Sequence, residues 1–537
     1  MSTITPDILQ LDRIEEYQEG HQIEAKAAQG GLPDTLWDTY SAFANTDGGC
    51  ILLGVKENKD HSLFAVGLND AVKMVKDFWN MVNNRQKISV NLMTEQRVRI
   101  EKVNGKEIIL LEVPRAERTS RPVFKGLDPR TGTYRRNGEG DYLCSLEEVS
   151  AMFRDAAIST QDAKVLKEMH TTVFCEETVS SYRQMFRLAH PNHEWNRLEN
   201  EVFLRRIGAT SVGDDGLYHP TAAGLLMFGY EYEILREFPQ YFLDYQENRQ
   251  MSTNRWTDRI VSSSGEWSGN IFDFVYKVVP KLTSDLKVPF VLKGVQRMDD
   301  TPVHKILREA VINACAHADF YGRRGLVIRK NTDGFIFENP GNMRVAKKEA
   351  VEGGVSDPRN GVILKIFSLI NYGERAGSGL SSIFNVWKHV YHTSAVIREE
   401  TGVDRVSLSL QNDGHAQDVN AMLELYDNPD ELKFSSVEMS DIMSEKQKMS
   451  DIKALKGKIR KELSDKAKMS DKMSDKMTDI VVLAIQEEYI STSLVALRLG
   501  LDKRNARRYL ARLVEFGYLS PEGTNKSKRY RSIVVLQ

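Results

Sequence analysis

A low-complexity stretch near the C-terminal end divides the chain and limits how it can fold. The tripeptide Met-Ser-Asp recurs there, and Met-Thr-Asp follows it, starting at Met439, Met449, Met469, Met473 and Met477. Such polar repeats are typical of solvated linkers, so we expect a linker over residues 416–476. A chain of 537 residues also exceeds what one hydrophobic core accommodates. The sequence therefore predicts an α+β protein of several domains.

Composition narrows the class of protein. The formal net charge is -2, so any affinity for nucleic acid must come from local basic patches. The four cysteines are scattered without a C-x-x-C pair, which indicates reduced thiols and neither a disulfide framework nor a zinc site. The acidic start of the chain is unlike a signal peptide, and no apolar run is long enough for a membrane span. We expect a soluble, cytoplasmic protein without a membrane partner.

Helix and strand signals alternate up to about residue 155. Apolar residues at helical spacing predict a helix over 35–45, which ends at the turn Asp47-Gly48-Gly49. The run from Cys50 to Val55 predicts a buried strand. Two further strands, over 97–103 and 107–113, flank Asn104-Gly105 and predict a hairpin.

Acidic residues and a lysine cluster before the first helix. Glu19, Glu24 and Lys26 lie within eight positions, and an extended backbone places Glu24 and Lys26 on one face of a strand. Carboxylates of this kind hold Mg²⁺ or Mn²⁺, which prefer oxygen ligands. The metal then activates water, and the lysine offsets charge on a scissile phosphate.

The same region resembles the divergent Alba-like domain of bacterial Schlafen-related proteins. The resemblance rests on Ser41 to Gly49, the strand Ile51 to Val55, and the later Arg121-Pro122-Val123 and Tyr134 to Gly138. It implies a domain over residues 1–155 in which Glu19, Glu24 and Glu57 bind the metal and, with Lys26, form a nuclease site. The family usually has Asp where Glu57 stands and an aromatic residue where Ala25 stands. A nucleic-acid-binding domain with a vestigial acidic cluster is the alternative.

Basic residues crowd the end of this domain. Arg121, Arg135 and Arg136 are interleaved with Phe124 and Tyr134. Such a mixture suits phosphate contacts and base stacking, so we predict nucleic-acid binding here, with a solvated hairpin as the alternative.

A second chemical pattern lies on a helix that begins near residue 300, after a mixed connecting region over residues 156–300. Glu309, Asn313 and His317 are four residues apart and share one helical face. Glu309 can polarise a hydrolytic water, and the side-chain oxygen of Asn313 can ligate Mg²⁺. The Gly-rich turn over 373–380 precedes another helix and offers backbone N–H groups to phosphate.

These motifs together resemble the GHKL-type ATP-binding fold, an α/β sandwich. The segments that carry the resemblance are Glu309-x3-Asn313, Ile336 to Gly341, Arg359-Asn360 and Gly377-x-Gly379-Leu380. The resemblance implies an ATP-binding module over residues 301–415, with Gly341, Gly377 and Gly379 at the nucleotide. Glu338 to Gly341 replaces the usual adenine-reading Asp motif. The alternative is a structural module that binds no nucleotide.

The last residues, 477–537, predict a compact basic unit. Helices are expected over 492–499 and 503–516, followed by a basic hairpin over 523–531. This pattern resembles a winged helix-turn-helix. We predict that it contacts nucleic acid through Arg504, Arg507, Arg508, Lys528 and Arg529. A protein-interaction module is the alternative.

The leading hypothesis is a metal-dependent endoribonuclease or nuclease under ATP control. The Schlafen resemblance implies RNA, including tRNA, as substrate and phage defence as the setting. The rival hypothesis is an ATP-binding, DNA-binding transcriptional regulator without nuclease activity. Both families form pairs, so we also expect a homo-oligomer.

Overall fold

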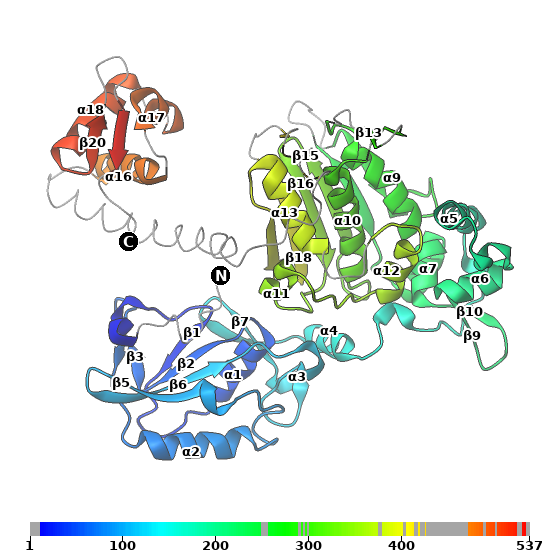
Figure 1. Ribbon diagram of the computed structural model, residues 1–537. Helices are drawn as coiled ribbons and strands as arrows, with labels where there is room; N and C mark the ends of the chain where they lie inside the picture. The colour runs from blue at the N-terminus through cyan, green and yellow to red at the C-terminus, as the bar shows by residue number, and fades with distance from the viewer. Residues whose placement is uncertain are drawn as a thin grey trace. The chain divides into compact units, whose positions relative to one another are not determined.

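The computed structural model falls into two compact units, Thr3–Lys433 and Phe434–Gln537, the latter with Met1–Ser2 (Figure 1). The residues that it describes are 11–248, 256–287, 292–293, 296–297, 300–373, 379–400, 404–412, 417–418, 421, 425, 471–486, 490–499, 502–522 and 529–532. The two units are described separately below.

The first domain of the larger unit is built on a four-stranded sheet in the order β1-β2-β6-β5. Its strands are β1 (Ile23–Lys26), β2 (Gly49–Leu53), β5 (Val98–Val103) and β6 (Lys106–Val113). β1 runs parallel to β2, and the other neighbours are antiparallel. The hairpin predicted at Asn104-Gly105 joins β5 to β6.

Both faces of this sheet are covered, which explains the continuous apolar run of β2. Ile51 and Leu53 pack against α1 (Leu36–Asn45) and α2 (Ala71–Val82). Cys50 and Leu52 point to the opposite face and pack against residues of the 3-10 helix Leu11–Glu16 and of the hairpin β3–β4. The remaining elements here are β3 (Val55–Glu57), β4 (Leu63–Ala65), α3 (Pro129–Gly132), β7 (Tyr134–Asn137), β8 (Gly140–Leu143) and α4 (Leu146–Ala156).

A helical segment follows α4. Its elements are α5 (Glu176–Ala189), α6 (Asn200–Ile207), β9 (Thr210–Val212), β10 (Tyr218–Pro220), α7 (Ala222–Phe228) and α8 (Glu231–Glu237). Tyr182 on α5 lies at its centre, where its ring contacts Phe203, Phe228 and Phe272. Phe272 lies on the helix α9 (Ile271–Thr283), so this aromatic cluster packs the segment against that helix.

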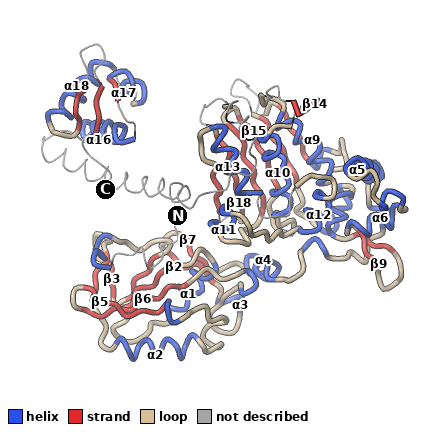
Figure 2. The backbone as a smooth tube through the Cα atoms, viewed as in Figure 1, coloured by secondary structure: helices blue, strands red, loops and turns tan. Residues whose placement is uncertain are grey.

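A mixed six-stranded sheet in the order β12-β11-β15-β16-β18-β17 forms the second half of the unit, and Figure 2 shows it in red. Its strands are β11 (Leu243–Glu247), β12 (Asp258–Val261), β15 (Leu326–Asn331), β16 (Gly334–Pro340), β17 (Val396–Glu400) and β18 (Arg405–Gln411). β11 and β15 are parallel, and the other pairs are antiparallel.

Helices α9 (Ile271–Thr283), α10 (Pro302–His317) and α13 (Gly379–Tyr391) lie side by side across one face of this sheet (Figure 1). On β18 the side chains alternate as this arrangement requires, with Val406, Leu408 and Leu410 buried between more exposed residues. The shorter elements nearby are β13 (Leu292–Lys293), β14 (Gln296–Arg297), α11 (Lys347–Glu352) and α12 (Gly361–Ser368).

The predicted boundary at residue 300 falls inside this fold. β11, β12 and α9 come from the segment that the sequence analysis treats as a connecting region, yet they complete the sheet and its helical cover. The sequence hides β12 because it is a short edge strand with the charged residues Asp258 and Arg259, which resembles a polar loop.

The C-terminal unit is a small α+β fold. Its elements are α16 (Asp471–Gln486), β19 (Ile490–Ser491), α17 (Thr492–Arg498), α18 (Lys503–Glu515), β20 (Leu519–Glu522) and β21 (Arg529–Ser532), with the strands in the order β19-β21-β20. α16 begins before the predicted linker end at 476, because Met477, Ile480 and Val481 on it belong to the core. Residues 426–470 of the predicted linker lie outside the described residues.

Two chemical features of the described residues bear on function. The four cysteines are buried, and none of them forms a disulfide bond. No helix in the described ranges is both long enough and apolar enough to cross a bilayer.

Candidate functional site

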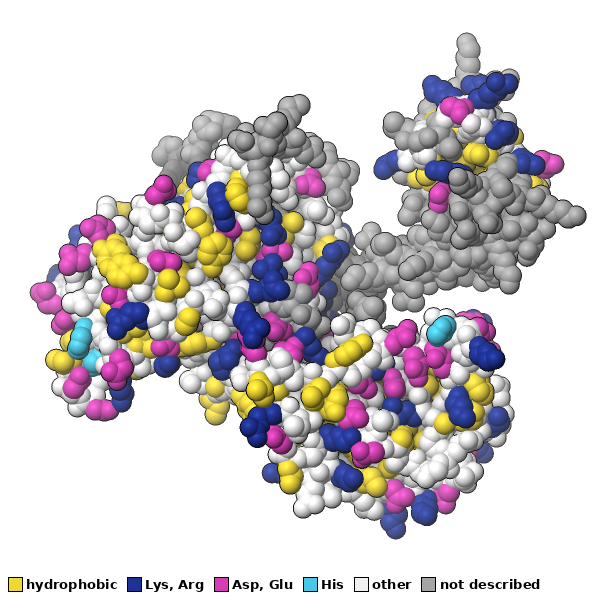
Figure 3. Space-filling model, turned by 180° about the vertical axis from the view of Figure 1, so that it is seen from behind, with side chains coloured by type: hydrophobic (Ala, Val, Ile, Leu, Met, Phe, Trp, Pro, Cys, Tyr) yellow, Lys and Arg dark blue, Asp and Glu magenta, His cyan; other side chains and the backbone are white. Residues whose placement is uncertain are grey.

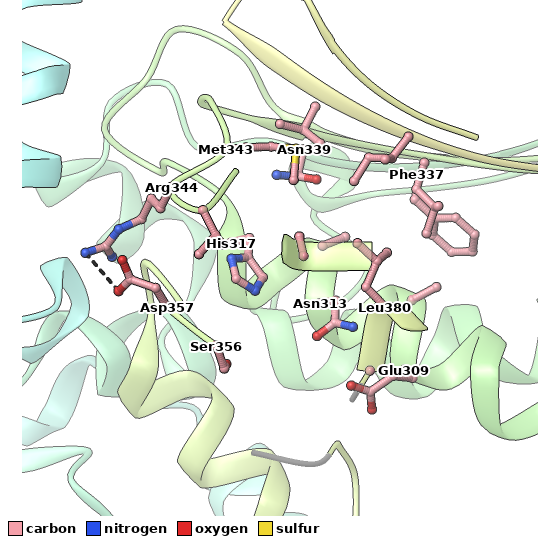
Figure 4. Close-up of a pocket in the computed structure, with 18 of the residues that line it drawn as sticks. Glu309, Asn313, His317, Phe337, Asn339, Met343, Arg344, Ser356, Asp357 and Leu380 are labelled. Carbon is pink, nitrogen blue, oxygen red and sulfur yellow. Dashed lines mark ion pairs between the residues drawn. The ribbon is translucent and has the colours of Figure 1, made fainter. Parts of the chain in front are cut away.

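One face of α10 lines a cavity of about 130 Å³ (Figure 4). Glu309, Asn313 and His317 all border it, as their spacing of four residues predicts. The opposite face of α10 is apolar and buried, which fixes the rotation of the helix. The three polar side chains are therefore held in a row along the cavity.

Gly379 at the start of α13 closes one end of this row. A Cβ atom at this position would collide with the carboxylate of Glu309 and would lie 2.9 Å from Nδ2 of Asn313. The absence of a side chain thus lets the helix start approach the two polar groups. The structure brings Gly379, Glu309 and Asn313 together, whereas Gly377 lies outside the described residues.

Strand β16 supplies the opposite wall. Phe337 and Asn339 line the cavity. Glu338 points to the other face of the sheet, where its Oε2 accepts hydrogen bonds from Arg329 at 2.6 Å and from Arg405 at 3.0 Å. Of the segment that replaces the usual adenine-reading motif, Asn339 is therefore the residue that presents a polar side chain to this cavity.

Gly341 lies elsewhere. It has a φ of +95°, and a Cβ atom there would lie 2.8 Å from Nη1 of Arg359. It borders a second, arginine-lined cavity and does not line the α10 cavity. Gly341 thus lies outside the lining of the α10 cavity, although Asn342 and Met343 directly after it belong to that lining.

The charge in the α10 cavity is low. Burial lowers the pKa of His317 to about 4, and the nearby guanidinium groups of Arg359 and Arg344 act in the same direction. His317 is therefore neutral at physiological pH. Arg344 and Asp357 form an ion pair of 3.3 Å at the other end of the cavity (Figure 4). Besides this ion pair, the cavity offers a ligand the carboxylate of Glu309, the amides of Asn313, Asn339 and Asn342, and the neutral imidazole of His317.

The predicted catalytic glutamates gather in the first domain. Burial raises the pKa of Glu19, and the neighbouring carboxylates of Glu24 and Glu57 raise it further, although a hydrogen bond from the Ala25 amide opposes them. Residues distant in sequence are thus brought within electrostatic range of one another.

Both carboxylate oxygens of Glu24, and one oxygen each of Glu19 and Glu57, already have hydrogen-bond partners. Glu24 accepts from Nζ of Lys26 at 2.9 Å through one oxygen and from Nη2 of Arg136 at 2.8 Å through the other. Glu57 contacts Nδ1 of His61 at 2.9 Å. Within the described ranges no three His, Cys, Asp or Glu side chains are placed to hold a metal ion. The arrangement therefore does not fit a divalent metal as it stands.

The basic residues of this domain are placed differently from their prediction. Arg136 is 1% exposed and donates to Asp141, Glu24 and the carbonyl oxygen of Gly20. It is a structural residue, and the prediction that it contacts nucleic acid is wrong because no part of its guanidinium faces solvent. Arg135 forms ion pairs with Glu148 and Asp404, and Arg121 faces the second cavity.

Exposed arginines in the C-terminal unit match the prediction in position. Arg504, Arg507 and Arg508 lie exposed on α18, whose N-terminus is capped by Asp502. Basic side chains gather on the described part of this unit in Figure 3, whereas both signs of charge are interspersed on the larger unit. Lys528 lies outside the described residues, as does the side chain of Arg529, whose backbone begins β21.

Several residues that line the α10 cavity could not be predicted as site residues from the sequence. His317 was visible through its spacing from Asn313. Asn339, Arg344 and Asp357 belong to other segments and reach the cavity only through the sheet and the loops that follow it. Their place depends on tertiary packing, which no local pattern encodes.

Comparisons with known proteins agree with part of this picture. Residues 19–145 match Schlafen, AlbA_2, and residues 150–244 match a domain of unknown function (DUF8451). The solved structure of the DIP2311 protein from Corynebacterium diphtheriae is 17% identical, covers 95% of this chain and 91% of its own, and has a TM-score of 0.39. The N-terminal domain of a protein related to the ATP-dependent DNA helicase RecG from Nitrosomonas europaea is 34% identical. That match covers 26% of this chain and 92% of the domain, with a TM-score of 0.20.

No curated protein matches the chain. The GHKL-like and winged-helix resemblances stay predictions. The predicted Schlafen-type domain is confirmed, and the chain carries a Schlafen AlbA_2 domain at residues 19–145.

Proposed function

We propose that this protein binds a nucleotide in the α10 cavity and acts on nucleic acid under the control of that nucleotide. The observation that carries the proposal is that Glu309, Asn313 and Gly379 lie together, although they come from two helices that are far apart in the sequence. A glycine that lets a helix start approach a carboxylate and an amide supports a site for phosphate and its metal ion.

The residues present suit ATP with Mg²⁺. Asn313 would offer its amide oxygen to the metal ion, and Glu309 would hold and polarise a water molecule. The bound metal supplies charge that offsets the phosphates. Asn339 and the neutral His317 offer hydrogen-bonding groups without charge, which suits the edge of a base.

Two parts of the chain support the nucleic-acid half of the proposal. The match of residues 19–145 to Schlafen, AlbA_2 suggests a nucleic-acid-related function. The exposed Arg504, Arg507 and Arg508 on α18 provide positive charge that phosphates attract. DNA is our proposed ligand for this helix, which makes a nucleotide-dependent regulator the function that the geometry supports best.

The test is a binding measurement with labelled duplex DNA, single-stranded DNA and tRNA, with and without ATP and Mg²⁺. We expect ATP to change the affinity of the wild type by about fivefold or more, in the range of ordinary allosteric coupling. Asn313→Ala should bind nucleic acid with one affinity whether or not ATP is present. Equal ATP effects in both proteins would reject the proposal.

A metal-dependent nuclease is a second candidate, and the gathering of Glu19, Glu24 and Glu57 favours it. In this candidate Glu24 must exchange its contact with Arg136 for a metal ion. Cleavage of labelled tRNA, total RNA and DNA with Mn²⁺ or Mg²⁺ tests it, with Glu19→Ala/Glu24→Ala as the variant. Cleavage by the wild type that the variant lacks would establish the nuclease. If the wild type cleaved none of these substrates under any condition, the nuclease candidate would be rejected and the nucleotide-dependent regulator would remain the proposed function. RNA as substrate, phage defence and the homo-oligomer stay predictions.

A further inference from the structure

A second cavity, of about 440 Å³, lies within the larger unit and is rich in arginine. Its walls come from the AlbA_2 domain and the segment that follows it, and from the six-stranded sheet with its loops. The described lining includes eight arginines and six acidic residues. The question is which of these eight positive charges are neutralised by neighbouring carboxylates.

Ion pairs neutralise most of these arginines. Arg359 is 1% exposed and binds Asp155 at 2.7 Å. Arg115 lies between Asp47 at 3.0 Å and Glu399 at 3.3 Å. These pairs join segments that are distant in the sequence, so they fix the cavity walls rather than bind a ligand.

Arg121 differs from its neighbours. Among the described residues, no carboxylate lies within ion-pair distance of its guanidinium, and no group accepts a hydrogen bond from it, although it lines the cavity. Burial lowers its pKa to about 10, and the neighbouring Arg115 also lowers it. Arg121 is therefore still charged at neutral pH. Arg121 is half-buried, and a partly desolvated cation without a partner is costly, so an anion in the cavity would offset that cost.

We propose that this cavity binds a small phosphorylated molecule, with Arg121 as the principal ligand of the phosphate group. The guanidinium fork matches two phosphate oxygens, and such charge-assisted pairs are among the strongest hydrogen bonds in proteins. The cavity is bordered by side chains from several segments of the chain, which limits the size of the ligand that fits between them. A small ligand suits it better than the backbone of a nucleic acid.

The position of the cavity gives such a ligand a role. Its lining joins the AlbA_2 domain, through Arg121 and Arg135, to the sheet end at Gly341 and Asp404. A bound phosphate would add contacts on both sides and would stabilise this arrangement of the unit.

The test is calorimetric titration of the full chain with inorganic pyrophosphate at constant ionic strength. Pyrophosphate is used because it lacks a base. Its binding should persist in Asn313→Ala, because Asn313 lines the α10 cavity and not the second cavity, and this variant therefore distinguishes the two sites. We expect Arg121→Gln to weaken the binding by about tenfold or more. Arg187→Gln removes an exposed arginine outside the lining and should bind like the wild type.

A second measurement separates a ligand-binding Arg121 from a structural one. Without pyrophosphate, Arg121→Gln should have a Tm equal to or above that of the wild type, because it removes a half-buried charge that has no ion-pair partner. If Arg121→Gln does not fold, Arg121→Lys takes its place in the titration. A lysine keeps the positive charge but lacks the two-pronged guanidinium, so this variant should bind pyrophosphate several-fold more weakly than the wild type.

Three results would overturn the proposal. They are no binding of pyrophosphate to the wild type, unchanged affinity in Arg121→Gln or Arg121→Lys, and a lower Tm of Arg121→Gln without any effect on affinity. A 5′-phosphorylated oligonucleotide that competes with pyrophosphate, while a phosphorylated mononucleotide does not, would replace the small ligand with a nucleic-acid end.

Discussion

Arg136 and Glu24 form an ion pair of 2.8 Å in the AlbA_2 domain, and the arginine is 1% exposed. The same guanidinium donates to Asp141 and to the carbonyl oxygen of Gly20, and it lies 5.1 Å from the centre of the Phe43 ring. This arginine therefore ties the strand β1 to the hairpin β7–β8. It also occupies the carboxylate that a metal ion would need.

Replacement of Arg136 should destabilise the domain strongly. Arg136→Ala leaves Asp141 without its cation and leaves Glu24 paired with Lys26 alone, and the loss of one partner of a buried pair costs about 3–5 kcal/mol. Hydrogen exchange of peptides from β1, β2 and α1 measures this loss of stability within the domain itself.

The control for this measurement is Arg130→Ala. Arg130 is exposed and pairs with Asp128 in the same domain, so its removal should leave the exchange of these peptides unchanged. Equal effects of the two substitutions would contradict the structural role of Arg136.

Stability should depend on pH through His317. Its pKa of about 4 in the fold lies below the ordinary value of 6.5, so below pH 6.5 the unfolded chain binds a proton that the fold does not. The contribution of His317 is complete above pH 6.5. It is lost as the pH falls towards 4, by at most about 1.4 kcal/mol per pH unit.

Thermal unfolding of the wild type and His317→Gln from pH 7 to pH 4 isolates this contribution. The Tm of the wild type should fall more steeply than that of the variant across this interval. Parallel curves would show that His317 is not held neutral in the cavity.

The arginines on α18 should bind phosphates without regard to sequence. The triple variant Arg504→Ala/Arg507→Ala/Arg508→Ala removes three exposed cations. The slope of the logarithm of the association constant for duplex DNA against the logarithm of the salt concentration should therefore decrease in magnitude by about 3. Fluorescence anisotropy at several salt concentrations measures the slope. As a control, Arg85→Ala/Arg187→Ala removes two exposed arginines of the larger unit and should keep the wild-type slope. If the triple variant on α18 also kept the wild-type slope, α18 would be excluded as the DNA-contacting surface.

Local patterns predicted the elements that carry much of the site. The spacing of Glu309, Asn313 and His317 predicted one helical face, and the cavity lies on that face. The alternation around Asn104-Gly105 predicted the β5–β6 hairpin. These predictions succeeded because helical and strand periodicity depend on neighbours within a few positions.

Tertiary partners decided the features that the sequence could not show. Arg136 lies in a basic segment, yet it is buried because Glu24, 112 positions earlier, pairs with it. β12 was hidden because its charged residues resemble a loop, and Gly341 borders the second cavity instead of the α10 cavity. Each outcome depends on contacts between segments that are far apart in the chain.

Calorimetric titration with ATP and Mg²⁺ tests the central claim most directly, with wild type, Asn313→Ala, Gly379→Ala and Gly30→Ala. Gly379→Ala introduces a Cβ that collides with Glu309 and lies 2.9 Å from Asn313, whereas a Cβ at Gly30 meets nothing within 4 Å. We predict that the wild type and Gly30→Ala bind alike, and that Asn313→Ala and Gly379→Ala bind about tenfold more weakly or worse. Absence of binding by the wild type, or equal affinity in all four proteins, would contradict a nucleotide site in the α10 cavity.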